Sequence, residues 1–201
     1  MKIAIISDIH ENFHNLILAF EEIERQNCKQ ILCLGDLMNA GIAKVLSCST
    51  IPVFMIWGNN DGEKVEITKV AHNQGGNLSV SLNTYDFLEI NNRKIFISHY
   101  DDLAIPMAAS QLYDAVFFGH THISSLQKEN ETWVVNPGEI SAHKTGIASL
   151  AIYDTDANDV HILELENSKT LKTGLVTDFF KKNKEVLKLR SEKAFNMGKM
   201  T

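Results

Sequence analysis

The side chains in this sequence that could carry chemistry are aspartates, histidines and an asparagine, placed in short motifs along the first two thirds of the chain. The first motif is Asp8-x-His10, in which residues two apart on an extended backbone project to the same side. Taken alone, this motif also fits a strand end that faces water, but later segments repeat the pattern. The full set is Asp8, His10, Asp36, Asn59, His99, His120 and His122.

These side chains offer only oxygen and imidazole nitrogen as donor atoms. Together they are about what two metal ions need, if one carboxylate bridges the ions and water completes their shells. Four histidines favour Mn, Fe, Zn, Ni or Co over Mg or Ca, because the latter two prefer shells made of oxygen. The residue types therefore predict a site for two divalent transition-metal ions.

Each of these residues is predicted at or just after a strand end, and such ends meet at one edge of a parallel sheet. The run Ile3–Ile6 predicts a strand buried on both faces, and Asn12–Gln26 has apolar residues at helical spacing. The other expected strands are Gln30–Leu34, Pro52–Ile56, Leu78–Leu82, Phe87–Ile90, Lys94–Ser98, Ala115–Phe118, Ser124–Lys128, Thr132–Val135, Ala148–Tyr153 and Val160–Leu165. Further helices are expected at Ile42–Leu46, Glu63–His72 and Met107–Leu112, and Asn91-Asn92 predicts a tight hairpin.

Composition indicates an ordinary globular protein. The 201 residues are 44% hydrophobic and 22% charged, and the net charge of -6 argues against a dedicated nucleic-acid binder. Three cysteines without zinc-type spacing predict reduced thiols and a cytoplasmic location. We expect neither a signal peptide nor a membrane-spanning segment, because no apolar run approaches the required length.

The charge balance changes after Glu166. Residues 167–201 carry nine basic and three acidic residues, whereas the preceding 166 residues carry ten basic and 22 acidic ones. Apolar residues in this basic C-terminal extension predict an amphipathic helix over Thr177–Asn196. We expect its apolar side to dock on the body of the protein or on a partner. Membrane, nucleic-acid or partner binding through the basic side is the alternative.

Taken in order, the motifs resemble those of the calcineurin-like metallophosphoesterase superfamily. The matching segments are Asp8-x-His10, Gly35-Asp36, Gly58-Asn59-x-Asp61, His99 and Gly119-His120-x-His122. The turn Asn136-Pro137-Gly138 and the small size resemble the compact bacterial and archaeal phosphodiesterases, to which a eukaryotic retromer scaffold subunit is also similar. The resemblance covers residues 1–166. It implies an α/β fold, a four-layer α/β/β/α sandwich of two mixed sheets with a dinuclear metal site at one edge.

The resemblance also implies a role for each residue. Asp8, His10, Asp36 and His122 would hold the first metal, and Asp36, Asn59, His99 and His120 the second, with Asp36 as the bridge. A hydroxide shared by two divalent ions, most simply Mn, would then attack phosphorus in line. Asp61 matches a supporting position behind the ligands, and with Asp36, Asn59 and His99 it completes the expected catalytic set. Glu11, Asn12, Asn60 and Asn136 are expected near the substrate.

Three positions depart from the family pattern. Asn60 replaces a histidine found in many superfamily members, and glycine is usual in place of Glu11 and Tyr100. We expect a metal-dependent phosphodiesterase that hydrolyses a small or nucleotide-like phosphodiester. The alternative is an interaction scaffold with this fold and little or no activity, and a homo-oligomer is left open.

Overall fold

The computed structural model describes residues 1–73 and 75–170. In this part of the chain, eleven strands form two mixed sheets, and four helices pack outside them. Residues Met1–Lys169 form one compact unit, which continues three residues past the domain boundary expected at Glu166. The helix expected over Thr177–Asn196 lies outside the described residues.

The first sheet joins the N-terminal strands to a C-terminal hairpin. Its spatial order is β11 (Asp159–Glu164), β10 (Ser149–Asp154), β1 (Lys2–Ile6), β2 (Gln30–Cys33), β3 (Val53–Met55) and β4 (Leu78–Val80). Strands β1 to β4 are parallel to one another, and β10 runs antiparallel to both β1 and β11. The register sets Ile5 opposite Leu32 on β2 and Ala151 on β10, so β1 lies in the interior of the sheet.

The second sheet is built from the middle of the chain. Its spatial order is β5 (Tyr85–Ile90), β6 (Arg93–Ser98), β7 (Ala115–Phe118), β9 (Thr132–Asn136) and β8 (Ser125–Glu129). Strands β6, β7 and β9 are parallel, while β5 and β8 are antiparallel partners at the two sides. The β5–β6 hairpin turns at Asn91 and Asn92, whose φ angles of 51° and 61° suit a two-residue turn, as expected.

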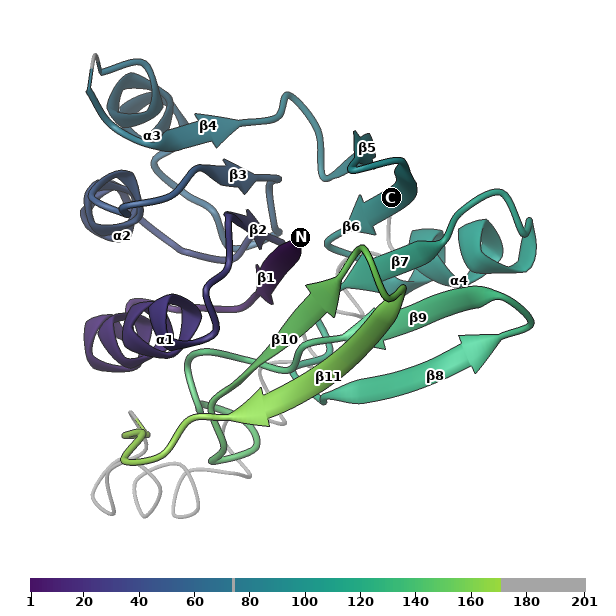
Figure 1. The fold of residues 1–201 in the computed structure, drawn as a ribbon. Coiled ribbons are helices and arrows are strands. Elements are labelled where there is room, and N and C mark those ends of the chain that lie inside the picture. Colours follow the sequence, from purple (N-terminus) through teal and green to yellow (C-terminus); the bar gives the residue numbers. More distant parts are fainter. Residues whose placement is uncertain (74, 171–201) are drawn as a thin grey trace, which may run out of the picture. The chain divides into compact units, whose positions relative to one another are not determined.

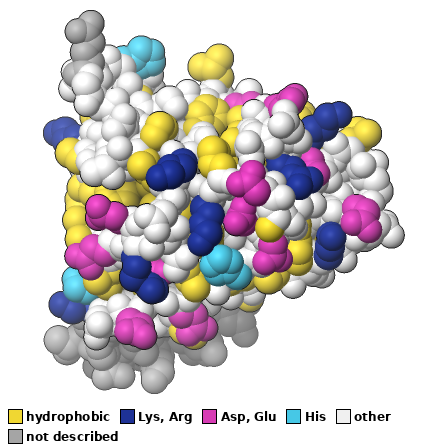
Figure 2. Space-filling view, viewed as in Figure 1, with side chains coloured by type: hydrophobic (Ala, Val, Ile, Leu, Met, Phe, Trp, Pro, Cys, Tyr) yellow, Lys and Arg dark blue, Asp and Glu magenta, His cyan; other side chains and the backbone are white. Residues whose placement is uncertain are grey.

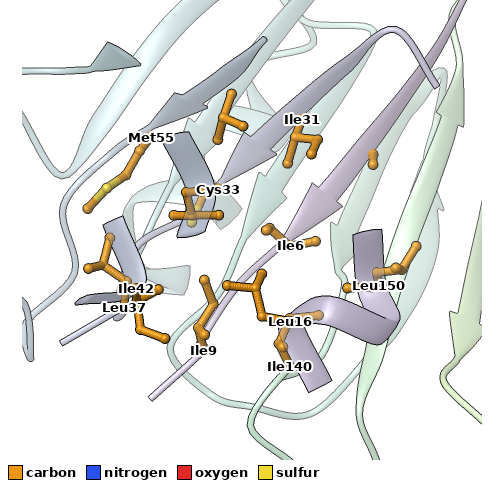
Figure 3. Packing of buried hydrophobic residues seen from close by; sticks show 14 of the residues in the cluster. Ile6, Ile9, Leu16, Ile31, Cys33, Leu37, Ile42, Met55, Ile140 and Leu150 are labelled. Atoms are coloured by element: carbon orange, nitrogen blue, oxygen red, sulfur yellow. The ribbon is translucent and has the colours of Figure 1, made fainter. Parts of the chain in front are cut away.

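The helices cover the outer faces of the two sheets (Figure 1). They are α1 (Phe13–Arg25), α2 (Ala40–Ser47), α3 (Lys64–Ala71) and α4 (Asp101–Ala109). One apolar core lies between the first sheet and helices α1 to α3, and in it Ile6 of β1 lies beside Leu16 of α1 (Figure 3). A second core lies between the sheets, and a third lies between the second sheet and α4. Three apolar cores separate four layers, which confirms the expected α/β/β/α sandwich.

The expected position of α4 was wrong. The sequence predicted a short helix over Met107–Leu112. The helix instead begins at Asp101, with Asp101 and Asp102 in its first turn, where negative charge is favourable. It ends at Ala109, and Gln111 has a φ of 60° that breaks the helical path.

The surface of the described residues carries charges of both signs. On the face in Figure 2, basic and acidic side chains are interspersed with apolar ones. None of the described helices is both long and apolar enough to cross a bilayer.

Candidate metal centre

The candidate ligands follow the carboxyl ends of β1, β2, β3, β6 and β7, and we call this end of the sandwich the metal edge. Asp8 and His10 follow β1, Asp36 follows β2, and His99 follows β6. Left-handed φ angles between 41° and 67° occur at five of the ligands, namely Asp8, His10, Asp36, His120 and His122. Residues other than glycine rarely adopt such angles, at a cost of roughly 1–3 kcal/mol each, and they cluster at functional sites.

Two glycines let the loops of the metal edge approach closely. A Cβ on Gly58 would lie 2.2 Å from Asp36 Oδ1, and one on Gly119 would lie 2.0 Å from Ser7 Oγ and 2.9 Å from Asp8 Oδ2. The motifs Gly58-Asn59 and Gly119-His120 therefore need glycine, because Asp36 in the first and Ser7 with Asp8 in the second occupy the space of a side chain.

The first group of ligands lies around Asp8. His122 Nε2 is 3.4 Å and His10 Nε2 is 3.6 Å from Asp8 Oδ1, and His10 Nε2 is 3.5 Å from Asp36 Oδ2. The rings of His10 and His122 are stacked, with their centroids 4.9 Å apart. One donor atom from each of Asp8, His10 and His122 lies within 4.8 Å of the others, close enough for a shared metal ion.

The second group lies around Asp36. His99 Nε2 is 3.6 Å from Asp36 Oδ1 and 3.0 Å from Asn59 Oδ1. The rings of His99 and His120 are 5.1 Å apart. Asp8, Asp36 and His99 form a second set of donor atoms within 4.8 Å of one another. The structure therefore brings all seven predicted ligands to one edge, with Asp36 between the two groups.

Two buried atoms at the centre of this cluster have no hydrogen-bond partner among the described residues, Asp8 Oδ1 and His10 Nε2. A buried polar atom without a partner is costly, and it calls for an explanation such as an ion. Burial raises the pKa of the Asp8 carboxyl, but the interactions with His10, His122 and His99 outweigh burial and lower it. Burial lowers the pKa of His10, but Asp8 and Asp36 outweigh this and raise it. The raised pKa of His10 shows that the carboxylates around it favour a positive charge, and the lowered pKa of Asp8 keeps its carboxyl in the charged form that can bind a cation.

Three ligands are held in place by groups behind them. His122 Nδ1 is 2.6 Å from Glu139 Oε2, and His99 Nδ1 is 2.7 Å from the carbonyl oxygen of Leu34. Asn60 donates to Asp36 twice, from its backbone N–H at 2.8 Å and from Nδ2 at 2.7 Å. A hydrogen bond at one ring nitrogen orients a histidine so that its other nitrogen can face a metal.

The buried side chain of Asp61 connects the loop after β2 to the loop after β3. Its carboxylate accepts hydrogen bonds from the backbone N–H groups of Asp36, Leu37, Met38 and Gly58, at 2.7 to 3.1 Å. Asp61 thus connects the loop of Asp36 to the loop of Gly58, and its role in supporting metal ligands stays a prediction.

The residues expected near the substrate differ in how deeply they are buried. Asn136 is fully buried, and its Nδ2 donates to the Gly119 carbonyl and to Thr121 Oγ1 within the histidine loop. Asn12 caps α1 by accepting from Asn15 N–H at 3.1 Å. Glu11 is exposed and accepts a hydrogen bond from Asn39 Nδ2.

Sequence reasoning missed Glu139. This side chain is fully buried, and besides His122 its carboxylate accepts from Ser141 Oγ, from Thr145 Oγ1 and from backbone N–H groups at positions 143 to 145. Burial raises the pKa of Glu139, but these hydrogen bonds outweigh burial and hold the pKa far below its usual value. The only signal in the sequence was a glutamate after the turn Asn136-Pro137-Gly138, a place where polar residues are common.

The fold and the arrangement of these side chains define a class of protein. The model of the calcineurin-like phosphoesterase superfamily domain matches residues 1–158, and the chain belongs to this family. One relative is the phosphodiesterase MJ0936 of Methanocaldococcus jannaschii, which is 30% identical over 168 residues that cover 83% of this chain and 100% of the relative.

Solved structures give the same fold. A structure described as a novel archaeal phosphodiesterase superposes with a TM-score of 0.73 at 27% identity, covering 82% of this chain and 100% of that one. Vps29 of Chaetomium thermophilum superposes with a TM-score of 0.59 at 17% identity, covering 84% of this chain and 91% of that one. The second likeness shows the shared fold alone.

Proposed function

We propose that this protein is a metal-dependent phosphodiesterase that hydrolyses a small or nucleotide-like phosphodiester. The observation that carries the proposal is the pair of unpartnered buried atoms, Asp8 Oδ1 and His10 Nε2, inside a cluster of carboxylates and imidazoles. Family membership and the relative named a phosphodiesterase support the same activity.

In this proposal Asp8, His10, Asp36 and His122 hold one divalent ion, and Asp36, Asn59, His99 and His120 hold the other. Bound metals of this kind lower the pKa of water towards neutrality and neutralise charge on phosphate oxygens. The histidine donors favour Mn, Fe, Zn, Ni or Co, and of these we propose Mn. The chain's own contribution is orientation, because Glu139, Asn60 and the Leu34 carbonyl fix the side chains that would face the metals.

Asn60 bears on the choice of substrate. An amide does not titrate near neutral pH, so Asn60 cannot protonate a departing alkoxide, a contribution that is typically ~10²–10⁴-fold. We therefore expect aryl diesters, which have good leaving groups, to be cleaved far better than alkyl diesters. The substitution Asn60→His would help poor leaving groups more than good ones. Phosphomonoesters carry a further negative charge beside the exposed Glu11 carboxylate and should be poor substrates.

The second candidate is an interaction scaffold with little activity. The shared fold of Vps29 makes it worth testing, as do Glu11 and the Tyr100 ring, whose centroid lies 5.0 Å from those of His99 and His120. In the scaffold, these side chains would obstruct the approach of a phosphate.

One experiment separates the two candidates. The metal content of the purified protein is measured, the metals are removed, and each candidate metal is restored in turn. Hydrolysis of bis(p-nitrophenyl) phosphate and of p-nitrophenyl phosphate is then compared. If the protein is a phosphodiesterase, it should hydrolyse the diester in a metal-dependent way and much faster than the monoester. A protein that binds two metals and cleaves neither ester would instead be the scaffold.

The location and the extension belong to the same proposal. All three cysteines are free, and burial raises the pKa of Cys33 to about 12, which suits a cytoplasmic protein with reduced thiols. We also propose that the basic extension docks on the body or on a partner, which includes a second copy of this chain.

A further inference from the structure

A cavity of about 220 Å³ adjoins the candidate metal centre at His122. Its walls come from Ile123 before β8, Ile147 before β10 and Glu164 at the end of β11. Figure 1 shows the starts of β8 and β10 and the end of β11 on the same side of the sandwich. We call this cavity the His122 pocket. His122 links it directly to the ligand cluster, because its Nε2 is 3.4 Å from Asp8 Oδ1.

The side chains that line the His122 pocket are apolar or already hydrogen-bonded, except for one carboxylate that can still accept a hydrogen bond. Ile123 is 64% and Ile147 is 48% exposed, so both offer apolar surface to a ligand. The hydroxyls of Thr145 and Ser149 are engaged, with Glu139 Oε1 at 2.8 Å and with the Pro137 carbonyl at 2.7 Å. Among the described residues, the exposed carboxylate of Glu164 makes no hydrogen bond or ion pair.

The buried carboxylate of Glu139 fixes the position of the His122 pocket relative to the metal centre. The Glu139 carboxylate accepts from the ring of His122 and also from Thr145 N–H at 2.8 Å, two residues before Ile147. The same side chain thus positions a ligand and a wall of the pocket. A group bound in the pocket therefore has a fixed distance from the metal centre, as a specificity site requires.

We propose that the His122 pocket binds the uncharged nucleoside of the phosphodiester, the ester group that stays on phosphorus after hydrolysis. This inference rests on the proposed function. In an in-line displacement, the leaving group departs opposite the attacking water. A phosphate lying over Asp8 and Asp36 would release its leaving group towards solvent. The retained ester group would then extend sideways, past His122.

The size and charge of the pocket define the class of substituent. A cavity of about 150 Å³ lined by apolar side chains holds benzene, so the His122 pocket has room for one ring of a nucleoside. Two isoleucines can flank such a ring, and Glu164 can accept a hydrogen bond from a hydroxyl or N–H of a nucleoside. The negative charge of Glu164 disfavours a second phosphate, so the pocket selects a single nucleoside over a longer polynucleotide.

The test uses three phosphodiesters with the same p-nitrophenol leaving group, whose second ester is methyl, phenyl or 5′-thymidyl. The ratio of kcat/KM between two of them is compared across variants, so that changes in metal content cancel. We expect Ile147→Ser and Ile123→Ser each to lower the phenyl-to-methyl ratio about tenfold, the effect of lost apolar contact in a pocket. Ile17→Ser on α1 is the matched control, since Ile17 is 47% exposed and lies outside the pocket.

Glu164 is tested by the thymidyl-to-phenyl ratio. Glu164→Ala should lower this ratio severalfold, whereas Glu164→Gln, which keeps a carbonyl acceptor, should largely preserve it. Unchanged ratios in both isoleucine variants, or an equal fall with Ile17→Ser, would overturn the assignment of the pocket. Failure of the proposed function would give a different result. In that case neither the unmodified protein nor any variant would hydrolyse the methyl diester.

Discussion

Left-handed backbone angles occur at both ends of the sandwich, in separate turns at one end and in a cluster at the other. At the end opposite the metal edge, Asn91, Asn92 and Asn158 have φ angles of 51° to 61°, and Gln111 has a φ of 60°. Asparagine tolerates such angles, so the turns at these asparagines cost little conformational free energy. At the metal edge the same angles gather at five candidate ligands, Asp8, His10, Asp36, His120 and His122, and such clusters of left-handed residues are typical of functional sites.

Hydrogen bonding separates the two ends in the same way. At the opposite end, Arg93 donates to Asp114 Oδ1 at 2.9 Å and to the Thr155 carbonyl at 2.8 Å, and the N-terminal amine pairs with Asp156. At the metal edge, buried atoms of Asp8 and His10 lack any such partner among the described residues. Strained angles together with unpartnered buried atoms distinguish a site from a turn.

The largest effect is expected from Asp36→Asn, which removes the carboxylate that we propose bridges the two metals. Metal binding should weaken and diester hydrolysis should fall by more than about 100-fold, since even a residue behind a ligand contributes 10–100-fold. Titration calorimetry and the bis(p-nitrophenyl) phosphate assay measure the two effects. The control at the opposite end is Asp156→Asn, which should leave both unchanged. Equal effects of the two substitutions would contradict the view that metal binding is confined to the metal edge.

Glu139→Gln should lower metal affinity by about 10–100-fold, because the carboxylate orients His122. It should also lower the free energy of unfolding of the metal-free protein. The folded pKa of Glu139 lies below its ordinary value of 4.5, so the charged carboxylate stabilises the fold fully above that pH. The stabilisation is lost as the pH falls further below 4.5. Urea unfolding at several pH values should show the variant approaching the unmodified protein in acid. A difference that grows in acid would contradict this role.

Gly119→Ala tests the close packing beneath Asp8. The new Cβ would overlap Ser7 Oγ and crowd Asp8 Oδ2, and overpacking of this kind costs about 1–3 kcal/mol of stability. We expect a lower Tm and weaker metal binding together. Gly62→Ala is the matched control, because the nearest heavy atom to its Cβ would be Met38 O, at 3.5 Å. A Gly119→Ala protein with an unchanged Tm and metal affinity would show that the loop relaxes freely.

Truncation should have the smallest effect, and its size should depend on where the chain is cut. Ending the chain after Thr170 should preserve the fold and metal binding. Ending it after Glu166 removes the Lys169 backbone, which bonds to Asn12 Nδ2 at 2.7 Å and to Asn15 Oδ1 at 2.8 Å. Each lost hydrogen bond is worth about 1 kcal/mol, so the shorter protein should have the lower Tm in calorimetry. An unfolded 1–170 protein would refute the view of residues 171–201 as an appendage.

The sequence predicted most of the fold because the central strands are apolar runs, such as Ile3–Ile6 in β1 and Ala115–Phe118 in β7. Ala115–Phe118 matches β7 at both ends, and Gln30–Leu34 differs from β2 by one residue. The predicted helix began six residues after the start of α4, because Asp101 and Asp102 were not used as a signal for the start of a helix. Pro106 lies inside α4, and a helix packed on a sheet along one face can tolerate the one hydrogen bond that proline cannot donate.

The site was predictable where a ligand lies in a motif at a strand end, as with Asp8-x-His10 and Gly119-His120-x-His122. It was not predictable where a residue acts across the fold. Glu139 lies 17 positions after His122, and only the tertiary structure places its carboxylate against that ring. The His122 pocket likewise joins three strand ends that are distant in the sequence.

The central claim is that the metal edge holds two ions bridged by Asp36, and electron paramagnetic resonance of the Mn-loaded protein tests it most directly. Metal-free protein is titrated with Mn²⁺ while bound metal and the spectrum are followed. We predict two bound ions per chain and the spectrum of an exchange-coupled pair, with the coupling lost in Asp36→Asn. Binding of a single ion, or two ions whose spectra are independent, would contradict the account.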